Sequence, residues 1–214
     1  NINGYLIDAP NIFIENTKKS ICEVPEMVKG SIPVDGGNLI IEEADYDEFI
    51  NKEPQAKKFI KQFYGAHEFL HNEKRYCLWL LGANPSDLKK CPLIMERVQK
   101  VKEMRLASTK EATRKFADYP TRFMEIRQPE SNYILIPSHS SETRRYIPLG
   151  FVSPDIICGN ANLLVPNASL YHFGIMTSNV HNAWMRVVCG RLKSDYRYSN
   201  TIVYNKFPGP NPSE

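Results

Sequence analysis

The stretch Tyr76-Cys-Leu-Trp-Leu-Leu81 is a continuous apolar run that ends at Gly82-Ala-Asn-Pro85. Six apolar residues closed by a glycine and a proline are typical of a strand that is buried on both faces. Residues 92–117 come next, with apolar side chains at helical spacing and basic side chains crowding the remaining faces. A buried strand followed by a long helix predicts a chain that mixes α and β structure.

The chain before this stretch has the same mixed character. Residues 5–7 and 38–41 are short apolar runs that predict strands, and Asp35-Gly-Gly37 predicts a tight turn. Residues 43–64 place apolar side chains mostly three and four positions apart, which predicts helix. Pro54 is a suitable first residue for a second helix within that segment.

The chain after residue 117 is rich in short β-like runs separated by proline and glycine. Strands are predicted at residues 133–136, 146–152, 156–157, 162–165, 171–175 and 201–204. A helix is predicted from about Ser178, a good N-cap residue. Its inward-facing side chains are predicted to be Val180, Ala183, Trp184, Val187 and Val188. Because strands and helices do not alternate regularly, we expect an α+β fold with mixed sheets and several helices.

Composition excludes several classes of protein. With 214 residues, 42% of them apolar and 24% charged, the chain can bury a core and is neither disordered nor fibrous. It has no apolar run of about 18 residues for a membrane span, and Asp8 interrupts any signal-like start. Five cysteines without a Cys-x-x-Cys pair indicate reduced thiols, so we expect a cytoplasmic protein. We also expect the chain to be part of a longer polypeptide.

The net charge of +3 is unevenly distributed. Residues 1–60 hold 6 basic and 11 acidic side chains, whereas residues 97–145 hold 11 basic and 6 acidic ones. Residues 181–206 hold 5 basic side chains and 1 acidic one. This asymmetry is consistent with a polyanionic partner for one face, although solvated helix faces produce the same pattern.

His67-Glu-Phe-Leu-His71 fits the His-Glu-x-x-His pattern of zinc hydrolases. On a helix, both imidazoles would bind the metal and Glu68 would act as general base. Gly65 and the turn-like residues 72–75 predict instead that the helix ends at the second histidine, and no third ligand stands out. A chance match is the favoured interpretation, and a zinc hydrolase through His67, Glu68 and His71 is kept as an alternative.

Other catalytic patterns are not found in the sequence. Ser138-His-Ser-Ser-Glu142 holds the residue types of a hydrolase triad, but sequence neighbours cannot adopt its geometry. Glycine-rich phosphate loops and the Asn/Asp-Pro-Pro-Tyr motif of amino-methyltransferases are missing. We therefore expect no catalysis and no bound cofactor in this part of the polypeptide.

Two segments have side chains suited to a polyanion. Ser140-Ser-Glu-Thr-Arg-Arg145 mixes arginine, which can pair with guanine, and glutamate, which can accept from cytosine. Gly190-Arg-Leu-Lys-Ser-Asp-Tyr-Arg-Tyr-Ser199 alternates basic, hydroxyl and aromatic residues that suit phosphate contacts and stacking. Solvated loops are the alternative interpretation of both.

Long collinear strings in the chain resemble the target-recognition region of MmeI-like restriction–modification enzymes. The strings that carry the resemblance are residues 5–10, 34–39, 75–79, 141–148, 178–199 and 203–208. They span nearly the whole chain and are far more specific than a five-residue motif. The His-Glu-x-x-His string lies inside this region, where the family is not a protease.

The resemblance implies a function for the chain and for the polypeptide that contains it. Residues 1–208 would be a DNA target-recognition domain and residues 209–214 a tail. The full bacterial enzyme would combine an endonuclease, which needs Mg²⁺, with an adenine methyltransferase that uses S-adenosylmethionine. The partners implied are double-stranded DNA and the methyltransferase domain of the same polypeptide, with no membrane. A scaffold that docks the methyltransferase domain without binding DNA remains a second alternative.

The resemblance also suggests roles for particular residues, because specificity in the family depends on a few charged side chains. The pair Glu142-x-Arg144 is the leading candidate for base readout. Further candidates for bases are Arg145, Ser140, Ser141, Lys110 and Arg114. Candidates for phosphate contacts or for docking on the methyltransferase domain are Arg186, Arg191, Lys193, Ser194, Arg197 and Tyr198.

Overall fold

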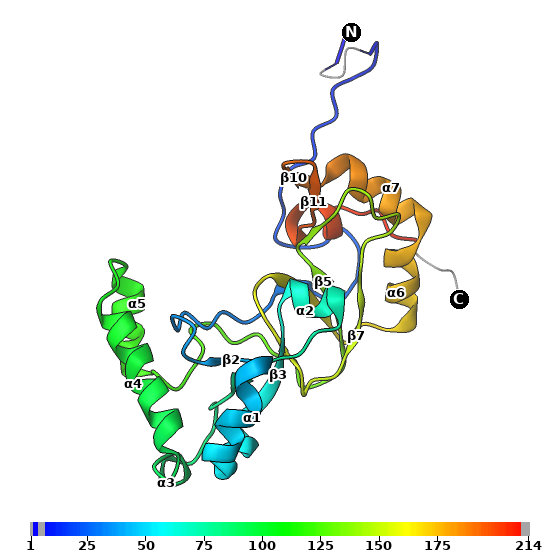
Figure 1. Cartoon of the computed structure of the whole chain (residues 1–214). Helices are drawn as coiled ribbons and strands as arrows, with labels where there is room; N and C mark the ends of the chain where they lie inside the picture. Colours follow the sequence, from blue (N-terminus) through cyan, green and yellow to red (C-terminus); the bar gives the residue numbers. More distant parts are fainter. Residues whose placement is uncertain (1, 4–6, 211–214) are drawn as a thin grey trace.

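The computed structural model describes residues 2–3 and 7–210 and has the predicted α+β architecture. Within these residues, helices α4 (Pro92–Leu106) and α5 (Glu111–Lys115) stand at one end of the molecule. Helices α6 (Leu170–Thr177) and α7 (Asn179–Val188) lie at the other end, and the sheets lie between them (Figure 1). No helix of the described part is long and apolar enough to cross a membrane.

One four-stranded sheet packs against the α4 end. Its order is β2 (Ile40–Glu42), β4 (Arg75–Leu78), β3 (Ile60–Tyr64) and β8 (Ile157–Cys158), with only the β3–β8 pair parallel among these strands. The shorter elements around it are α1 (Glu43–Lys52), the 3₁₀ helices Pro54–Phe59 and Phe116–Asp118, α2 (Ala66–His71) and α3 (Pro85–Leu88). The apolar run at residues 76–81 supplies Cys77, Leu78 and Leu80 to this core, as predicted for a buried strand.

A second four-stranded sheet is antiparallel throughout. Its order is β1 (Val28–Lys29), β9 (Asn162–Pro166), β5 (Tyr133–Pro137) and β7 (Gly150–Val152). All five residues of β5 are buried, because both faces of the strand are covered. This central strand leads directly into β6 (His139–Ser140), so the core and the polar loop that follows are consecutive in the chain.

A small third sheet stands beside α7. Strands β10 (Gly190–Leu192) and β11 (Asp195–Arg197) form a hairpin, and β11 also pairs with β6. The π-helix Asn200–Tyr204 follows the hairpin and returns the chain to the core. Trp184 of α7 donates a hydrogen bond from its indole to the carbonyl of Val203 at 2.9 Å, which ties the helix to this return.

Arg105 holds the segment 33–34 to the α4 end of the molecule. Its side chain is fully buried, and its guanidinium donates to five main-chain carbonyls, those of Pro33, Val34, Phe116, Tyr119 and Arg122. Burial lowers the pKa of Arg105, but an arginine keeps its charge in proteins. The sequence pattern over 92–117, in which Arg105 is one of the basic side chains outside the apolar stripe, did not indicate this burial.

Several predicted elements differ from the structure. Residues 60–64 were expected to be helical but form β3, because pairing with β4 and β8 outweighs an apolar spacing that suits either structure. The helix predicted over 92–117 ends at Leu106, and a turn separates it from α5. Residues 171–175 belong to α6 and not to a strand; Ser169 and His172 form a capping box at its start.

Four further predictions concern three predicted strands and the helix α7. Residues 201–204 are π-helix and not strand, and only residues 150–152 of the strand predicted over 146–152 are paired. Of the predicted strand 5–7, residues 5 and 6 lie outside the described residues. The helix predicted from Ser178 is confirmed, and Trp184 and Val188 of its predicted inward face pack against the core. The rest of that face is wrong: Val180 and Val187 are 70% and 73% exposed, and His181, Asn182 and Met185 are the buried residues of the helix.

Candidate nucleic-acid interface

Residues 141–147, named here the recognition loop, follow β6 and bring the predicted base-reading residues to the surface. Residues 142–146 are exposed. The loop is ordered by its own start, where the Ser141 hydroxyl lies 2.9 Å from that of Thr143 and the Arg144 amide donates to the Ser141 carbonyl at 3.1 Å. Within the described residues, the side chains of Glu142 and Arg144 have no hydrogen bond or ion pair, so both are available to a ligand.

The two segments predicted to contact a polyanion form one surface. Strand β6, which precedes the recognition loop, pairs with β11 of the hairpin, with Ser140 opposite Tyr196 and His139 opposite Arg197. Since side chains alternate between the faces of a strand, Ser140 and Tyr196 point inward and are buried. His139, Asp195 and Arg197 are exposed on the other face, next to the recognition loop.

Burial removes two predicted residues from this surface. Ser140 is 8% exposed and Tyr198 is 4% exposed, so neither side chain can contact DNA in this conformation. The Tyr198 hydroxyl lies 2.9 Å from Nε2 of His181 inside the core, where burial raises the pKa of Tyr198 well above its ordinary value. This burial argues against the predicted roles of Ser140 in base readout and of Tyr198 in phosphate contact or docking on the methyltransferase domain.

Arg186 and Arg191 bind main-chain carbonyls. Nη2 of Arg186 donates to the carbonyl of Arg145 in the recognition loop. Nη1 of Arg191 donates to the Ser194 carbonyl at 2.9 Å, and its guanidinium lies 4.1 Å from the centre of the Tyr196 ring. Both guanidinium groups are thus engaged in holding the hairpin and the loop, which leaves fewer donors for phosphate.

Lys193, Ser194 and Arg197 remain exposed on the hairpin. Lys193 and Ser194 form its two-residue turn, and Lys193 has a left-handed backbone with φ of 56°. No hydrogen bond or ion pair engages the charged groups of Lys193 and Arg197 within the described part of the chain. These two cations are therefore better suited to phosphate contact than Arg186 and Arg191.

Lys110 and Arg114 lie far from the recognition loop. They belong to the start of α5, at the opposite end of the molecule from β10 and β11 (Figure 1). Arg114 donates to the carbonyls of Ser108 and Thr109 at 2.8 and 2.9 Å, which closes the turn before α5. The structure therefore does not bring these two residues together with Glu142 and Arg144.

The His-Glu-x-x-His string forms α2, which ends at His71 as predicted, with Asn72 in a left-handed conformation. The two imidazole rings lie 4.3 Å apart, but His67 faces Glu73 at 3.2 Å and Glu68 faces Arg75 at 3.5 Å. Among residues 2–3 and 7–210, no group of three or more histidines, cysteines, aspartates or glutamates is arranged to hold a metal ion.

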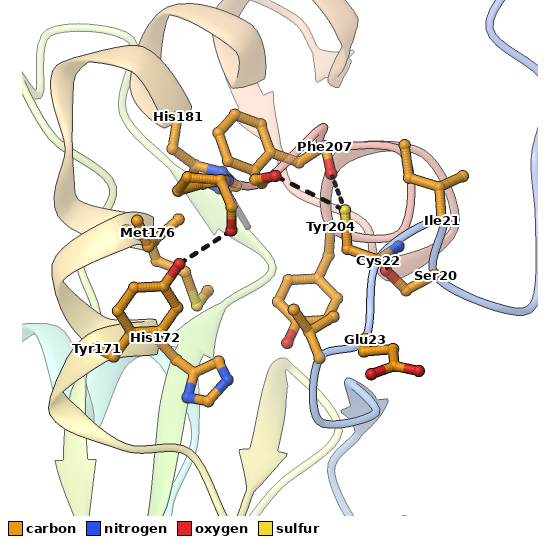
Figure 2. A pocket seen from close by; sticks show the side chains of 14 residues that line it. Ser20, Ile21, Cys22, Glu23, Tyr171, His172, Met176, His181, Tyr204 and Phe207 are labelled. Atoms are coloured by element: carbon orange, nitrogen blue, oxygen red, sulfur yellow. Dashed lines mark hydrogen bonds between the residues drawn. The ribbon is translucent and has the colours of Figure 1, made fainter. Parts of the chain in front are cut away.

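A cavity of about 500 Å³ lies between α6, the π-helix and residues 20–24 (Figure 2). The Tyr171 hydroxyl donates to the Pro210 carbonyl at 3.0 Å, and the Cys22 thiol faces the carbonyls of Phe207 and Gly209. Residues 209 and 210 therefore pack on the body of the domain. None of the residues predicted to contact DNA lines this cavity.

Sequence reasoning missed the residues that hold the recognition loop. The Glu142 amide donates to Oδ1 of Asp195 at 3.2 Å, and the Ile147 amide donates to Oδ1 of Asn182 at 2.9 Å. The Tyr146 hydroxyl donates to Oδ1 of Asn179 at 3.0 Å. The sequence carried no clear signal for these contacts, because Asn182 stands between His181 and Ala183 and lies outside the face that the apolar spacing predicted to be buried.

Comparisons with known proteins agree with this geometry. A family model described as the MmeI target recognition domain matches residues 8–211. DNA methyltransferase A of Bacillus subtilis (strain 168) is 40% identical over 210 residues, which are 98% of this chain and 24% of that protein. The structure of the Type IIL restriction-modification enzyme MmeI in complex with DNA is 42% identical, with a TM-score of 0.95. The match covers 100% of this chain and 29% of that chain, so this chain spans about a quarter of its relatives' length. The chain therefore belongs to the family of MmeI target recognition domains.

Proposed function

We propose that residues 1–208 form a domain that recognises a specific double-stranded DNA sequence for a restriction–modification enzyme of the bacterial cytoplasm. The observation that carries this proposal is the exposed recognition loop, whose unpaired Glu142 and Arg144 stand beside a basic hairpin. The relatives support it, since one is named a DNA methyltransferase and another was solved in complex with DNA.

Two kinds of contact would divide the work of recognition. Lys193 and Arg197 would neutralise phosphates and fix the register of the domain on the duplex, independently of sequence. Glu142, Arg144 and Arg145 would read base edges, because carboxylate and guanidinium groups distinguish cytosine from guanine by their hydrogen bonds. Ser141 and Ser194 would add contacts to bases and phosphates, respectively. Lys110 and Arg114, at the α5 end, would act only if the duplex also reaches that end.

Catalysis would belong to other parts of the full polypeptide. There, S-adenosylmethionine would supply the methyl group for adenine, and Mg²⁺ would serve an endonuclease. This chain would select the DNA sequence that is presented to the methyltransferase domain. Part of the surface of this chain would dock on that domain. A zinc hydrolase at His67, Glu68 and His71 has no supporting observation beyond the motif, because His67 faces Glu73 and the required base, Glu68, faces Arg75.

The test is selection of bound duplexes from a random pool by the full-length protein. The wild type should enrich a short asymmetric consensus, and the double variant Glu142→Lys/Arg144→Asp should change the preferred base at one position. A matched control is Lys57→Ala, which removes an exposed basic side chain of the 3₁₀ helix Pro54–Phe59, outside the recognition loop and the hairpin, and should leave the consensus unchanged. A consensus that survives the double variant would move base readout to another surface. Absence of any enrichment by a folded protein would favour a docking scaffold.

A further inference from the structure

The recognition loop is attached to the rest of the domain near its start, middle and end. Its first exposed amide, that of Glu142, is bound by Asp195 of β11 at 3.2 Å. Its middle is bound by Arg186 of α7 through the carbonyl of Arg145. Its last amide, that of Ile147, is bound by the side chain of Asn182 at 2.9 Å. The loop is therefore fixed in position although its side chains are exposed.

Asn182 is fully engaged in this attachment. It is 2% exposed, and its Nδ2 donates to the Ser178 carbonyl at 2.8 Å while its Oδ1 accepts from the Ile147 amide. Ser178 in turn caps α7, since its hydroxyl accepts from the His181 amide. The end of the loop is thus tied to the first turn of a helix that is itself held by the core.

Asp195 has a different setting, because it is exposed and carries no ion pair within the described residues. An exposed carboxylate on a surface that faces polyanionic DNA would weaken binding by repulsion. Its contact with the recognition loop explains its presence there: Oδ1 accepts a hydrogen bond from the Glu142 amide at the start of the loop. The hairpin turn beside it is stabilised by Arg191, which binds the Ser194 carbonyl.

We propose that Asp195 and Asn182 are positioning residues for sequence readout, acting on DNA through the recognition loop, an inference that rests on the function proposed above. By binding main-chain amides at the two ends of the loop, they hold Glu142 and Arg144 in the geometry that base edges require. Preformed geometry matters because a loop ordered only on binding loses part of its interaction energy to that ordering. Loss of either attachment lowers discrimination between bases more than it lowers general affinity for DNA.

The experiment compares Asp195→Ala with Asp195→Asn in the full-length protein. Both variants remove the negative charge, but only asparagine keeps an oxygen that can accept from the Glu142 amide. The readout is the ratio of affinities for the selected consensus and for duplexes altered at the position that the Glu142/Arg144 double variant changes. Asp195→Ala should reduce this ratio about three- to tenfold, and Asp195→Asn should keep it within about twofold of the wild type. Amide hydrogen exchange of peptides covering residues 141–147 should accelerate in the alanine variant only.

Two further measurements separate positioning from the other roles of an acidic residue. Any change in the salt dependence of affinity should be the same in both variants, because both remove the same negative charge and neither removes a phosphate contact. The control Asp155→Ala removes an aspartate whose side chain is 88% exposed and lies 3.8 Å from Lys61, and it should change neither readout.

The outcomes that overturn the inference differ from those that overturn the proposed function. If the double variant changes the consensus but Asp195→Ala keeps the base ratio within twofold, the positioning role is wrong and base readout stands. If Asp195→Asn and Asp195→Ala lose discrimination equally, the charge and not the hydrogen bond is responsible, and the inference also fails. If the double variant leaves the consensus unchanged, the proposed readout itself fails.

Discussion

Nε of Arg105 lies 2.9 Å from the carbonyl oxygen of Val34, a β-branched residue with φ of 47°. A left-handed backbone at valine is unfavourable, so the surrounding structure must hold it. The same guanidinium also binds Pro33 and the segment 116–122, which places one buried cation at the meeting point of three chain segments. Four predictions about stability and binding follow from such local arrangements.

Arg105→Met should destabilise the protein strongly. Methionine fills much of the same volume but leaves five carbonyl oxygens without their donor, and buried unsatisfied groups cost about 1–3 kcal/mol each before relaxation. We expect a loss of about 3 kcal/mol or more in the free energy of unfolding, measured by urea denaturation. Arg105→Lys keeps a cation with three donors and should lose less. A loss below about 1 kcal/mol for methionine would contradict a central role for these bonds.

Val34→Gly should leave stability unchanged or raise it by up to about 1 kcal/mol. Glycine adopts positive φ without steric cost, which offsets the greater entropy that it gives to the unfolded chain. The matched control is Val28→Gly in strand β1, where no such strain exists and glycine should destabilise. Thermal unfolding of the two variants and the wild type measures the difference between the two changes in stability. Equal losses at both positions would show that the left-handed conformation of Val34 is not strained.

Lys193→Gly should separate folding stability from binding. The turn residue has φ of 56°, so glycine should fold at least as well as lysine. Removal of its charge should weaken binding to all duplexes alike and lower the slope of log affinity against log salt by about 0.9. Lys193→Ala removes the same charge without relieving the backbone and should bind as weakly as the glycine variant. A changed base preference in either variant would assign Lys193 to readout instead of phosphate contact.

His181 should make stability depend on pH in the acidic range. Burial lowers its pKa to about 4, against an ordinary value of about 6.5, because desolvation disfavours the imidazolium. Between these values the unfolded chain binds a proton that the folded chain does not. The contribution of neutral His181 to the free energy of unfolding is therefore fully present above about pH 6.5. This contribution, about 3 kcal/mol in total, is lost as the pH falls towards 4.

The variant His181→Gln tests this pH dependence, because glutamine can still reach the Tyr198 hydroxyl but does not titrate. The difference in unfolding free energy between wild type and variant should change between pH 7 and pH 4 and then level off. A constant difference over this range would mean that the buried imidazole is protonated in both states or in neither.

The sequence predicts the class of fold and two polar segments that the structure brings together, but not the contacts of their residues. Local signals were sufficient for the helix after Ser178 and for the first half of the apolar run at 76–81, whereas the strand ends at Leu78 and Leu81 is 45% exposed. The prediction of helix for residues 60–64 was wrong, because pairing with β4 and β8, which lie elsewhere in the chain, decides their structure. The burial of Tyr198 was not predicted for the same reason, since its partner His181 is identified only once α7 is packed.

The exposed pair Glu142 and Arg144 stands on a loop whose attachments at Glu142, Arg145 and Ile147 all use main-chain atoms. Main-chain groups are the same whatever side chain follows them, with proline as the exception for the two amides. The loop can therefore exchange its charged side chains without giving up its support. In evolutionary terms, the exposed side chains of the loop can therefore change while its backbone conformation is kept. Under the proposed readout, substitutions at positions 142, 144 and 145 would change the target sequence without a compensating change in α7 or β11.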